Sequence, residues 1–221
     1  DDAVPRRVIA LEIPHHRTYH YWHAFVPGVK VGQVYAYRAH GTRDASRGFR
    51  FDETKVLFDP YGRGLVRPKK YDRGAACRPG DNGAFALKSF VADARTYDWE
   101  GDRPLQRPYE NTVIYEMHVA GFTKNPNSGV SPEKRGTYAG VIEKIPYLKD
   151  LGVTAVELMP VFEFDEQDGP RGLTNYWGYS PLSFFMPHRG FSSRKDLNGP
   201  IDEFRDMVKA LHKAGIEVIL D

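Results

Sequence analysis

The sequence predicts a multi-domain chain in which an all-β domain precedes an α/β segment. Three observations lead to this prediction. Residues 1–95 are rich in glycine and aromatic residues and contain short runs that alternate apolar and polar side chains. Residues 96–110 are polar, contain two prolines and show no periodicity, which is typical of a linker. Residues 111–221 alternate apolar, β-branched stretches with helical patterns.

Short strands with turn residues between them are expected in the first domain. The stretches TYHYWHAFVPG (residues 18–28) and GQVYAYRAHG (residues 32–41) have the period of two that is typical of half-buried strands. The pair Pro27-Gly28 is a turn signal between them. The stretches VLFDPYG and GAFALKSFV follow, again separated by glycine and proline. Strands this short at this spacing predict an all-β sandwich.

The third part begins with the strand-like stretch TVIYEMHV (residues 112–119). A helical pattern follows, in which Pro146 either kinks the helix or begins a new one, and Gly152 occupies a helix C-cap position. The stretch VTAVELMP (residues 153–160) predicts a second strand. The stretch PIDEFRDMVKALHKAG predicts a helix with one apolar stripe, and this helix ends at Gly215. The stretch IEVILD then predicts a third strand.

This order of strand, helix, strand, helix and strand predicts parallel pairing with both faces of the sheet covered. Such an arrangement is either a doubly wound sheet or the opening of a (β/α)8 barrel. A complete barrel needs roughly 250 residues, so residues 111–221 would form less than half of one.

Composition and charge exclude several classes of protein. The chain has 31 basic and 29 acidic residues, and this balance argues against a nucleic-acid partner. The single cysteine, Cys77, excludes an internal disulfide and fits a reducing, cytoplasmic location. No apolar run approaches the roughly 20 residues of a membrane span, so no membrane partner is expected. Since the chain begins with Asp1 rather than Met, a preceding targeting segment is left open.

The connection after the second strand is the candidate binding segment. It runs from Val161 to Gly199, whereas such connections usually have about 2–6 residues. It contains NYWGYSPLSFF, with Tyr176, Trp177 and Tyr179 close together. Aromatic rings match the apolar face of a pyranose, although the same rings could simply pin the loop to the body of the protein. No glycine-rich phosphate-binding motif lies at a strand-to-helix turn, so a nucleotide site is not supported.

The carboxylates of the chain are weak candidates for catalysis. Asp165, Glu166 and Asp168 lie in a polar loop and are expected to be solvated. Glu116 and Glu157 lie inside predicted strands, where a structural pairing is expected rather than catalysis.

The histidines and the aromatic residues of the first domain are also expected to be structural. His118 follows the first α/β strand and is expected to be a hydrogen-bonded structural residue. The spacing of His15, His16, His20 and His23 fits no zinc motif, so surface positions are expected. Three aromatic residues of the first domain fit a core as well as they fit glucan binding: Trp22, Tyr35 and Tyr37.

Several longer stretches resemble a known family. The second half is similar to the start of the catalytic barrel of the α-amylase superfamily, glycoside hydrolase family 13, through VIYEMHVAGFT, RGTYAGVIEKIPYLKDLGVTAVELMPV, NYWGYSPLSFFMPHRGF and EFRDMVKALHKAGIEVILD. The first half resembles the carbohydrate-binding module of family 48 through FVPGVKVGQVYAYRAHG and KVLFDPYGRGLV. Within the superfamily, the combination is most similar to isoamylases and bacterial glycogen debranching enzymes.

The resemblance implies an immunoglobulin-like β-sandwich followed by the first part of a (β/α)8 TIM barrel that is cut at its third strand. It implies retaining hydrolysis of α-1,6 branch linkages in an α-glucan such as glycogen, amylopectin or limit dextrin. No cofactor is required, and calcium binding does not follow from the sequence. A glycogen branching enzyme and a non-catalytic glucan-binding module are the alternatives.

The resemblance also implies roles for four residues. Tyr179 matches the family tyrosine that stacks on the sugar at the cleavage site, and Tyr176 and Trp177 would shape the same pocket unless they only pack. Asp221 matches the first aspartate of a DVVYNH-like motif and would line the bottom of the pocket. The family's nucleophile, its acid/base residue and its third carboxylate would all lie beyond residue 221. No catalytic residue is therefore expected within this chain, and the chain alone is expected to be inactive.

Overall fold

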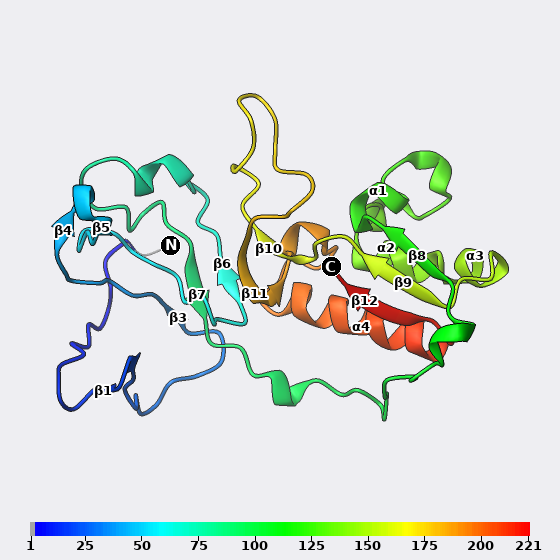
Figure 1. Ribbon diagram of the computed structural model, residues 1–221, viewed down its shortest axis with the longest axis horizontal. Helices are drawn as coiled ribbons and strands as arrows, with labels where there is room; N and C mark the ends of the chain where they lie inside the picture. Colours follow the sequence, from blue (N-terminus) through cyan, green and yellow to red (C-terminus); the bar gives the residue numbers. More distant parts are fainter. Residues whose placement is uncertain (1–2) are drawn as a thin grey trace. The chain divides into compact units, whose positions relative to one another are not determined.

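The computed structural model describes residues 3–221 and divides them into two compact units (Figure 1). The first unit contains residues 3–59 and 65–91, and the second contains residues 60–64 and 92–221. None of the helices in the described part of the chain has the length and apolar character that a membrane crossing demands.

The first unit is built from short antiparallel strands, which confirms the predicted all-β class. The strands β3 (Val34–Tyr35), β7 (Lys88–Phe90) and β6 (Leu65–Val66) form a sheet in the order β3-β7-β6. Two small hairpins are formed by β1 (Arg17–Thr18) with β2 (Tyr21–Trp22), and by β4 (Arg43–Asp44) with β5 (Phe49–Arg50). Tyr37 and Leu57 form an isolated bridge.

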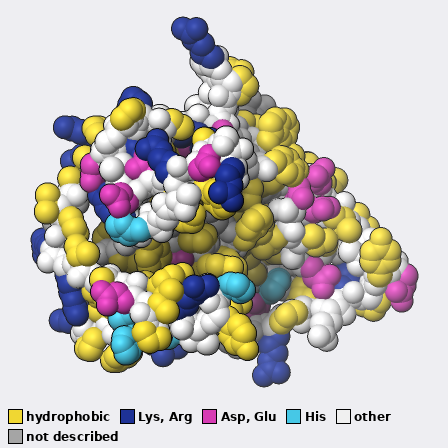
Figure 2. All heavy atoms as spheres, turned by 60° about the vertical axis from the view of Figure 1, so that its left-hand side comes forward, with side chains coloured by type: hydrophobic (Ala, Val, Ile, Leu, Met, Phe, Trp, Pro, Cys, Tyr) yellow, Lys and Arg dark blue, Asp and Glu magenta, His cyan; other side chains and the backbone are white. Residues whose placement is uncertain are grey.

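The alternating stretch at residues 18–28 does not form the expected half-buried strand. It contributes only Thr18 of β1 and the two residues of β2 to a hairpin, and Tyr19, Tyr21 and Phe25 are exposed. Figure 2 shows that hydrophobic side chains lie among charged ones on the surface of the face that it draws. The period of two therefore marks exposed side chains here, because a two-residue ladder offers no second layer against which a face could pack.

The second unit contains a three-stranded parallel sheet, as the sequence predicted. Its strands are β8 (Ile114–Met117), β9 (Ala155–Leu158) and β12 (Glu217–Leu220), in the order β12-β9-β8. The helices are α1 (Val119–Thr123), α2 (Tyr138–Glu143), α3 (Ile145–Asp150) and α4 (Gly199–Lys213). Short 3-10 turns of this unit lie at Ala94–Thr96, Tyr109–Asn111, Pro126–Ser128, Pro132–Lys134 and Arg189–Phe191, whereas the turns Ala45–Arg47 and Arg73–Ala76 belong to the first unit.

The helix boundaries follow the glycine and proline signals. Pro146 lies in the first turn of α3, so a new helix begins there rather than a kinked one continuing. Gly152, after α3, has a φ of +84°, and the Val153 N–H donates to the Leu148 carbonyl at 3.1 Å. Gly215, after α4, has a φ of +80°, and both helices end in the left-handed cap that favours glycine.

One face of the parallel sheet carries the core. Because the strands are neighbours in sequential order, both crossovers return on the same side, and α2 and α4 contact each other there. The core cluster joins the sheet to these helices through residues that include Met117, Val156, Leu158, Tyr138, Leu148, Met207 and Leu211. On the other face, Ile114, Glu116 and Ile219 are accessible to solvent. The expectation that both faces are covered is therefore wrong for the described chain.

The long connection after β9 contains secondary structure of its own. Strands β10 (Phe162–Phe164) and β11 (Pro181–Pro187) pair antiparallel, with irregular register. The loop between them, drawn in yellow in Figure 1, extends beyond the end of the hairpin and carries Tyr176, Trp177 and Tyr179. The pairing of β10 with β11 fixes both ends of the loop that carries the aromatic residues.

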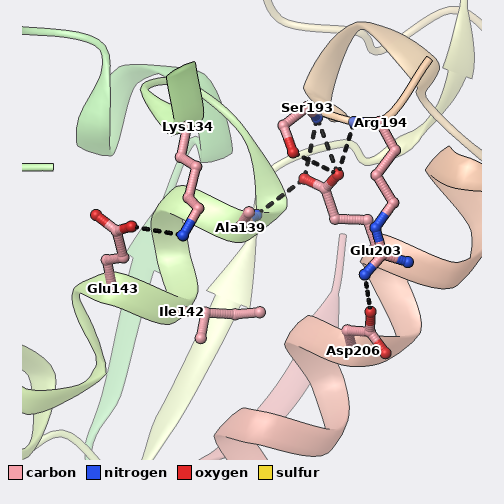
Figure 3. Close-up of a pocket in the computed structure, with 8 residues that line it drawn as sticks. All are labelled: Lys134, Ala139, Ile142, Glu143, Ser193, Arg194, Glu203 and Asp206. Atoms are coloured by element: carbon pink, nitrogen blue, oxygen red, sulfur yellow. Dashed lines mark hydrogen bonds and ion pairs between the residues drawn. The ribbon is translucent and has the colours of Figure 1, made fainter. Parts of the chain in front are cut away.

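A buried carboxylate fastens α4 to its neighbours (Figure 3). Glu203 is 1% exposed and accepts hydrogen bonds from the backbone N–H groups of Ala139, Ser193 and Arg194. The adjoining cavity, of about 280 Å³, is bordered by two ion pairs, Lys134 with Glu143 and Arg194 with Asp206. It lies on the helical side of the sheet, and the charges at its rim already have partners.

Replacement of Glu203 tests this fastening. Burial alone would raise the pKa of Glu203, but the hydrogen bonds from Ser193, Ala139 and Arg194 outweigh it, so the pKa lies below its ordinary value of 4.5. The stabilisation is therefore complete above about pH 4.5 and is lost as the pH falls through the lowered pKa. We expect Glu203→Gln to reduce the free energy of unfolding by about 3 kcal/mol at pH 7, and by less at pH 3.5.

Urea unfolding followed by helical circular dichroism measures this difference, since the four α-helices described within residues 3–221 lie in the second unit. The exposed Glu133 provides the matched control, and Glu133→Gln should change stability by less than about 0.5 kcal/mol. Equal effects of the two substitutions, or an effect of Glu203→Gln that does not depend on pH, would contradict the assignment.

Candidate functional site

The candidate site lies where the three parallel strands end. In a parallel sheet the carboxyl ends of all strands meet at one edge, and binding groups collect there. His118 follows β8 directly, and Asp221 follows β12. The Asp221 N–H donates to the Leu158 carbonyl at 3.1 Å, which extends the ladder and fixes the position of Asp221 beside the end of β9.

Tyr179 and Asp221, two of the predicted site residues, are in direct contact. The Tyr179 hydroxyl donates a hydrogen bond of 2.5 Å to Asp221 Oδ2. The two residues come from different elements, the loop of the β10–β11 hairpin and the end of β12. The Tyr179 side chain remains 58% exposed, so its ring is accessible to a ligand while its hydroxyl is held.

The charges near Tyr179 keep its phenol protonated. The hydrogen bond to Asp221 is the main cause that raises the pKa of Tyr179 to about 12, followed by desolvation and by the negative charges of Asp221, Glu116 and Glu157. Tyr179 therefore acts as a hydrogen-bond donor throughout the physiological pH range, and Asp221 acts as the acceptor.

Glu116 and Glu157 face each other across neighbouring strands. They are register partners in the pairing of β8 with β9, so their side chains lie on the same, uncovered face of the sheet. Their expected structural pairing is not found, because no Lys or Arg forms an ion pair with either residue among residues 3–221. The open face of the sheet therefore carries uncompensated negative charge next to Asp221.

Tyr176 and Trp177 lie beside His118 rather than beside Asp221. The rings of His118 and Tyr176 are stacked at 4.1 Å with an interplanar angle of 5°, and Trp177 meets both rings edge-on. Tyr176 and Trp177 remain 47% and 55% exposed. Each of them thus packs with one part of its ring and presents another part to solvent. The packing that the sequence allowed is present, and ring surface remains accessible to a ligand.

The acidic loop differs from its prediction at one residue. Asp165 is buried, and its Oδ1 accepts a hydrogen bond of 3.0 Å from the Gln167 N–H. The expectation of a solvated charge is therefore wrong for Asp165, because the residue turns the chain at the end of β10. Glu166 is half-buried and Asp168 is exposed.

A buried pair that the sequence analysis missed lies at the base of the hairpin. Glu163 and His188 are both almost fully buried, with 3.3 Å between Glu163 Oε2 and His188 Nδ1. The hydrogen bond to Glu163 Oε2 comes from the Arg189 N–H at 2.9 Å, and the His188 ring stacks on Phe164 at 3.8 Å. A single glutamate inside the apolar run VFEF is the signal that could have revealed this pair.

The N-terminal histidines are mostly at the surface, as expected. His15, His20 and His23 are exposed, and His16 is half-buried and accepts a hydrogen bond from the Glu12 N–H. Within residues 3–221, no group of three or more histidine, cysteine, aspartate or glutamate residues has the arrangement of a metal site.

The mutual dependence of Tyr179 and Asp221 can be measured directly. Asp221→Asn retains an acceptor oxygen but removes the negative charge, so we expect the pKa of Tyr179 to fall from about 12 towards its ordinary value of 10. Nuclear magnetic resonance of Cζ-labelled tyrosine reports this titration, with Tyr179→Phe to assign the signal. Asp196→Asn, a change to another aspartate of the same unit, serves as the control and should leave the titration unchanged. A Tyr179 signal that is unaffected by Asp221→Asn would show that the contact does not form in solution.

Comparison with known proteins matches both halves of the chain. Residues 98–221 match the family described as alpha amylase, catalytic domain, and residues 4–62 match carbohydrate-binding module 48, the isoamylase N-terminal domain. A glycogen debranching enzyme from Yersinia pseudotuberculosis is 45% identical over 233 residues, which cover 100% of this chain and 34% of that protein. A glycogen operon protein GlgX homolog from Mycobacterium tuberculosis is 42% identical over 90% of the chain and 30% of its own length. The chain thus spans about a third of these relatives.

Solved structures give the same match at the level of the fold. The product complex of SpuA, a glycogen-degrading pneumococcal virulence factor, aligns with a TM-score of 0.61 and 27% identity over 75% of this chain and 18% of its own. The Group B Streptococcus pullulanase SAP aligns with a TM-score of 0.60 and 28% identity over 76% of this chain and 23% of its own. A pullulanase from Anoxybacillus in complex with maltotetraose aligns with a TM-score of 0.57 and 29% identity over 76% and 24%.

Proposed function

Because the chain belongs to the α-amylase catalytic-domain family and begins with a carbohydrate-binding module of family 48, we propose that it is the substrate-facing N-terminal part of an α-glucan debranching hydrolase. The substrate would be glycogen, amylopectin or limit dextrin, cleaved at α-1,6 branch linkages with retention of configuration. The proposal is supported by relatives that are named as glycogen debranching enzymes and by similar structures that are named as pullulanases.

The contact between Tyr179 and Asp221 is the observation that carries this proposal. A pyranose has an apolar C–H face and a rim of hydroxyl groups, and an exposed tyrosine ring matches the first while a carboxylate accepts from the second. Tyr179 offers its ring at the carboxyl edge of the sheet, and Asp221 offers an oxygen beside it. We assign glucosyl contact to both residues, and to the exposed parts of Tyr176 and Trp177.

None of the described carboxylates is proposed as nucleophile or acid. Retaining hydrolysis needs two carboxyl groups whose environments push their pKa values apart. Glu116 and Glu157 share one environment on adjacent strands, and Asp221 is held by Tyr179. We therefore propose that these residues shape and charge the pocket, and that the reacting carboxylates belong to later strands of the barrel.

We propose a carbohydrate-binding module at residues 1–95, a linker at 96–110 and the start of the barrel at 111–221. A cytoplasmic location is proposed from the glycogen-metabolising relatives.

Glucan binding by this chain tests the site without requiring turnover. We expect a branched maltodextrin to bind in isothermal titration calorimetry, and Tyr179→Ala to weaken binding about tenfold through loss of the stacked ring. Tyr179→Phe keeps the ring and should cost less. Tyr147, a half-exposed tyrosine of α3, provides the matched control, because Tyr147→Ala removes a ring on the helical side of the sheet. Equal affinities for the wild type and Tyr179→Ala would refute the assignment of the site.

Turnover gives a second test. The chain alone is expected to release no reducing ends from pullulan above the buffer rate, because two differentiated carboxyl groups are required. Measurable release that survives repeated purification and is abolished by Glu116→Gln or Glu157→Gln would contradict the proposed division of roles.

A further inference from the structure

His118 connects two segments that are 58 residues apart in the sequence. Its Nδ1 accepts a hydrogen bond of 3.0 Å from the Gly121 N–H, which caps the start of α1. Because Nδ1 is an acceptor, the proton of the neutral ring is on Nε2, and Nε2 donates to the Tyr176 carbonyl at 2.9 Å. One imidazole therefore links the end of β8 to the loop of the β10–β11 hairpin.

The ring contacts of His118 add to these hydrogen bonds. His118 is 9% exposed, with Tyr176 stacked on one side and the Phe191 ring edge-on at 5.3 Å. The Tyr176 hydroxyl lies close over Gly121, since a Cβ at Gly121 would be only 2.6 Å from it. Tyr176 is thus held by the hydrogen bond to its carbonyl, by the stacking of its ring on His118 and by the close approach of its hydroxyl to Gly121.

Tyr176 lies in the turn Asn175–Tyr179, and the other end of this turn is held by the hydrogen bond between Tyr179 and Asp221. Between the two contacts, the Gly178 N–H donates to Asn175 Oδ1 at 3.1 Å, and Gly178 has a φ of +79°. A Cβ at Gly178 would lie 2.7 Å from the Phe164 ring, so the turn passes close to β10. The turn Asn175–Tyr179 therefore spans from His118, at the end of β8, to Asp221, at the end of β12.

We propose that His118 is a positioning residue, which holds the turn Asn175–Tyr179 so that the Tyr179 ring faces the glucosyl site. The role in glucan binding rests on the function proposed above, whereas the anchoring of the turn does not. The alternative, in which His118 only caps α1, does not account for the hydrogen bond to the Tyr176 carbonyl or for the parallel stacking of the two rings.

The anchor requires a neutral imidazole. Protonation of Nδ1 would place two N–H groups against each other at Gly121. Burial lowers the pKa of His118, the bond to the Tyr176 carbonyl opposes this, and the nearby His188 lowers it further. His188 and the Tyr176 phenol are the titratable groups that face the ring, and the other neighbours, Trp177 and Phe191, carry no charge.

Two substitutions separate capping from anchoring. In His118→Asn, the side-chain oxygen can still accept from the Gly121 N–H, because asparagine is a good N-cap, but the side chain is too short to reach Tyr176. In His118→Gln, the longer amide can place an N–H near the position of Nε2 and donate to the Tyr176 carbonyl. Neither variant retains the stacked ring.

Hydrogen exchange of the peptide that contains residues 173–180, followed by mass spectrometry without any ligand, measures the anchoring. We expect His118→Asn to increase exchange about tenfold while the melting temperature changes little, and His118→Gln to restore part of the protection. The affinity for a branched maltodextrin should follow the same order: wild type, then His118→Gln, then His118→Asn.

Unchanged exchange in His118→Asn would overturn the proposal. An equal loss of protection in both variants, with a matching fall in melting temperature, would also overturn it, because it would show general packing only. If the wild type binds no glucan, the proposed function fails, and the exchange measurement still decides whether His118 holds the turn.

Discussion

The sequential order of the parallel strands is the constraint on which the second unit depends. Because β8, β9 and β12 are neighbours in chain order, their crossovers lie on the same side and bring α2 and α4 into contact. The apolar side chains of the strands and helices can then form one continuous core between the two layers. No helix of residues 3–221 covers the other face of the sheet, and all three carboxyl ends open onto one edge.

The carboxylates on the two sides of this sheet differ in whether they have hydrogen-bond or ionic partners among the described residues. On the helical side, Glu203 is buried but satisfied by backbone and hydroxyl donors from two segments. A buried carboxylate is tolerated only when such donors replace its water, so Glu203 helps to specify how α4 docks. On the open side, Glu116 and Glu157 have no cationic partner within residues 3–221 and remain next to Asp221. The buried Glu203 thus lies on the opposite side of the sheet from Glu116 and Glu157.

The hairpin after β9 connects the open edge to the aromatic residues. Its base is fixed by the pairing of β10 with β11 and by the buried Glu163 and His188. Its loop returns to the sheet at two points, His118 and Asp221, and between them keeps large parts of three aromatic rings in solvent. Exposed rings at the carboxyl edge of a barrel-type sheet suit a carbohydrate ligand, because they supply an apolar surface whose orientation is already set before binding.

Local signals in the sequence determined the elements of the second unit. The glycines at 152 and 215 mark helix ends through their left-handed conformation, and Pro146 marks a helix start, because these effects involve only neighbouring residues. Tyr179 and Asp221 are candidate site residues through stretches that resemble a family, although no spacing rule predicts that they touch.

Tertiary structure alone decided the partners and the burial of each side chain. The anchoring role of His118, the burial of Asp165 and the pair formed by Glu163 and His188 depend on contacts between segments that packing brings together. The aromatic alternation of residues 18–28 likewise indicated a half-buried strand, but burial requires a second layer, and none of the described residues of the unit forms one over them. A periodic pattern specifies which side chains share a face, whereas only the assembled fold decides whether anything packs against that face.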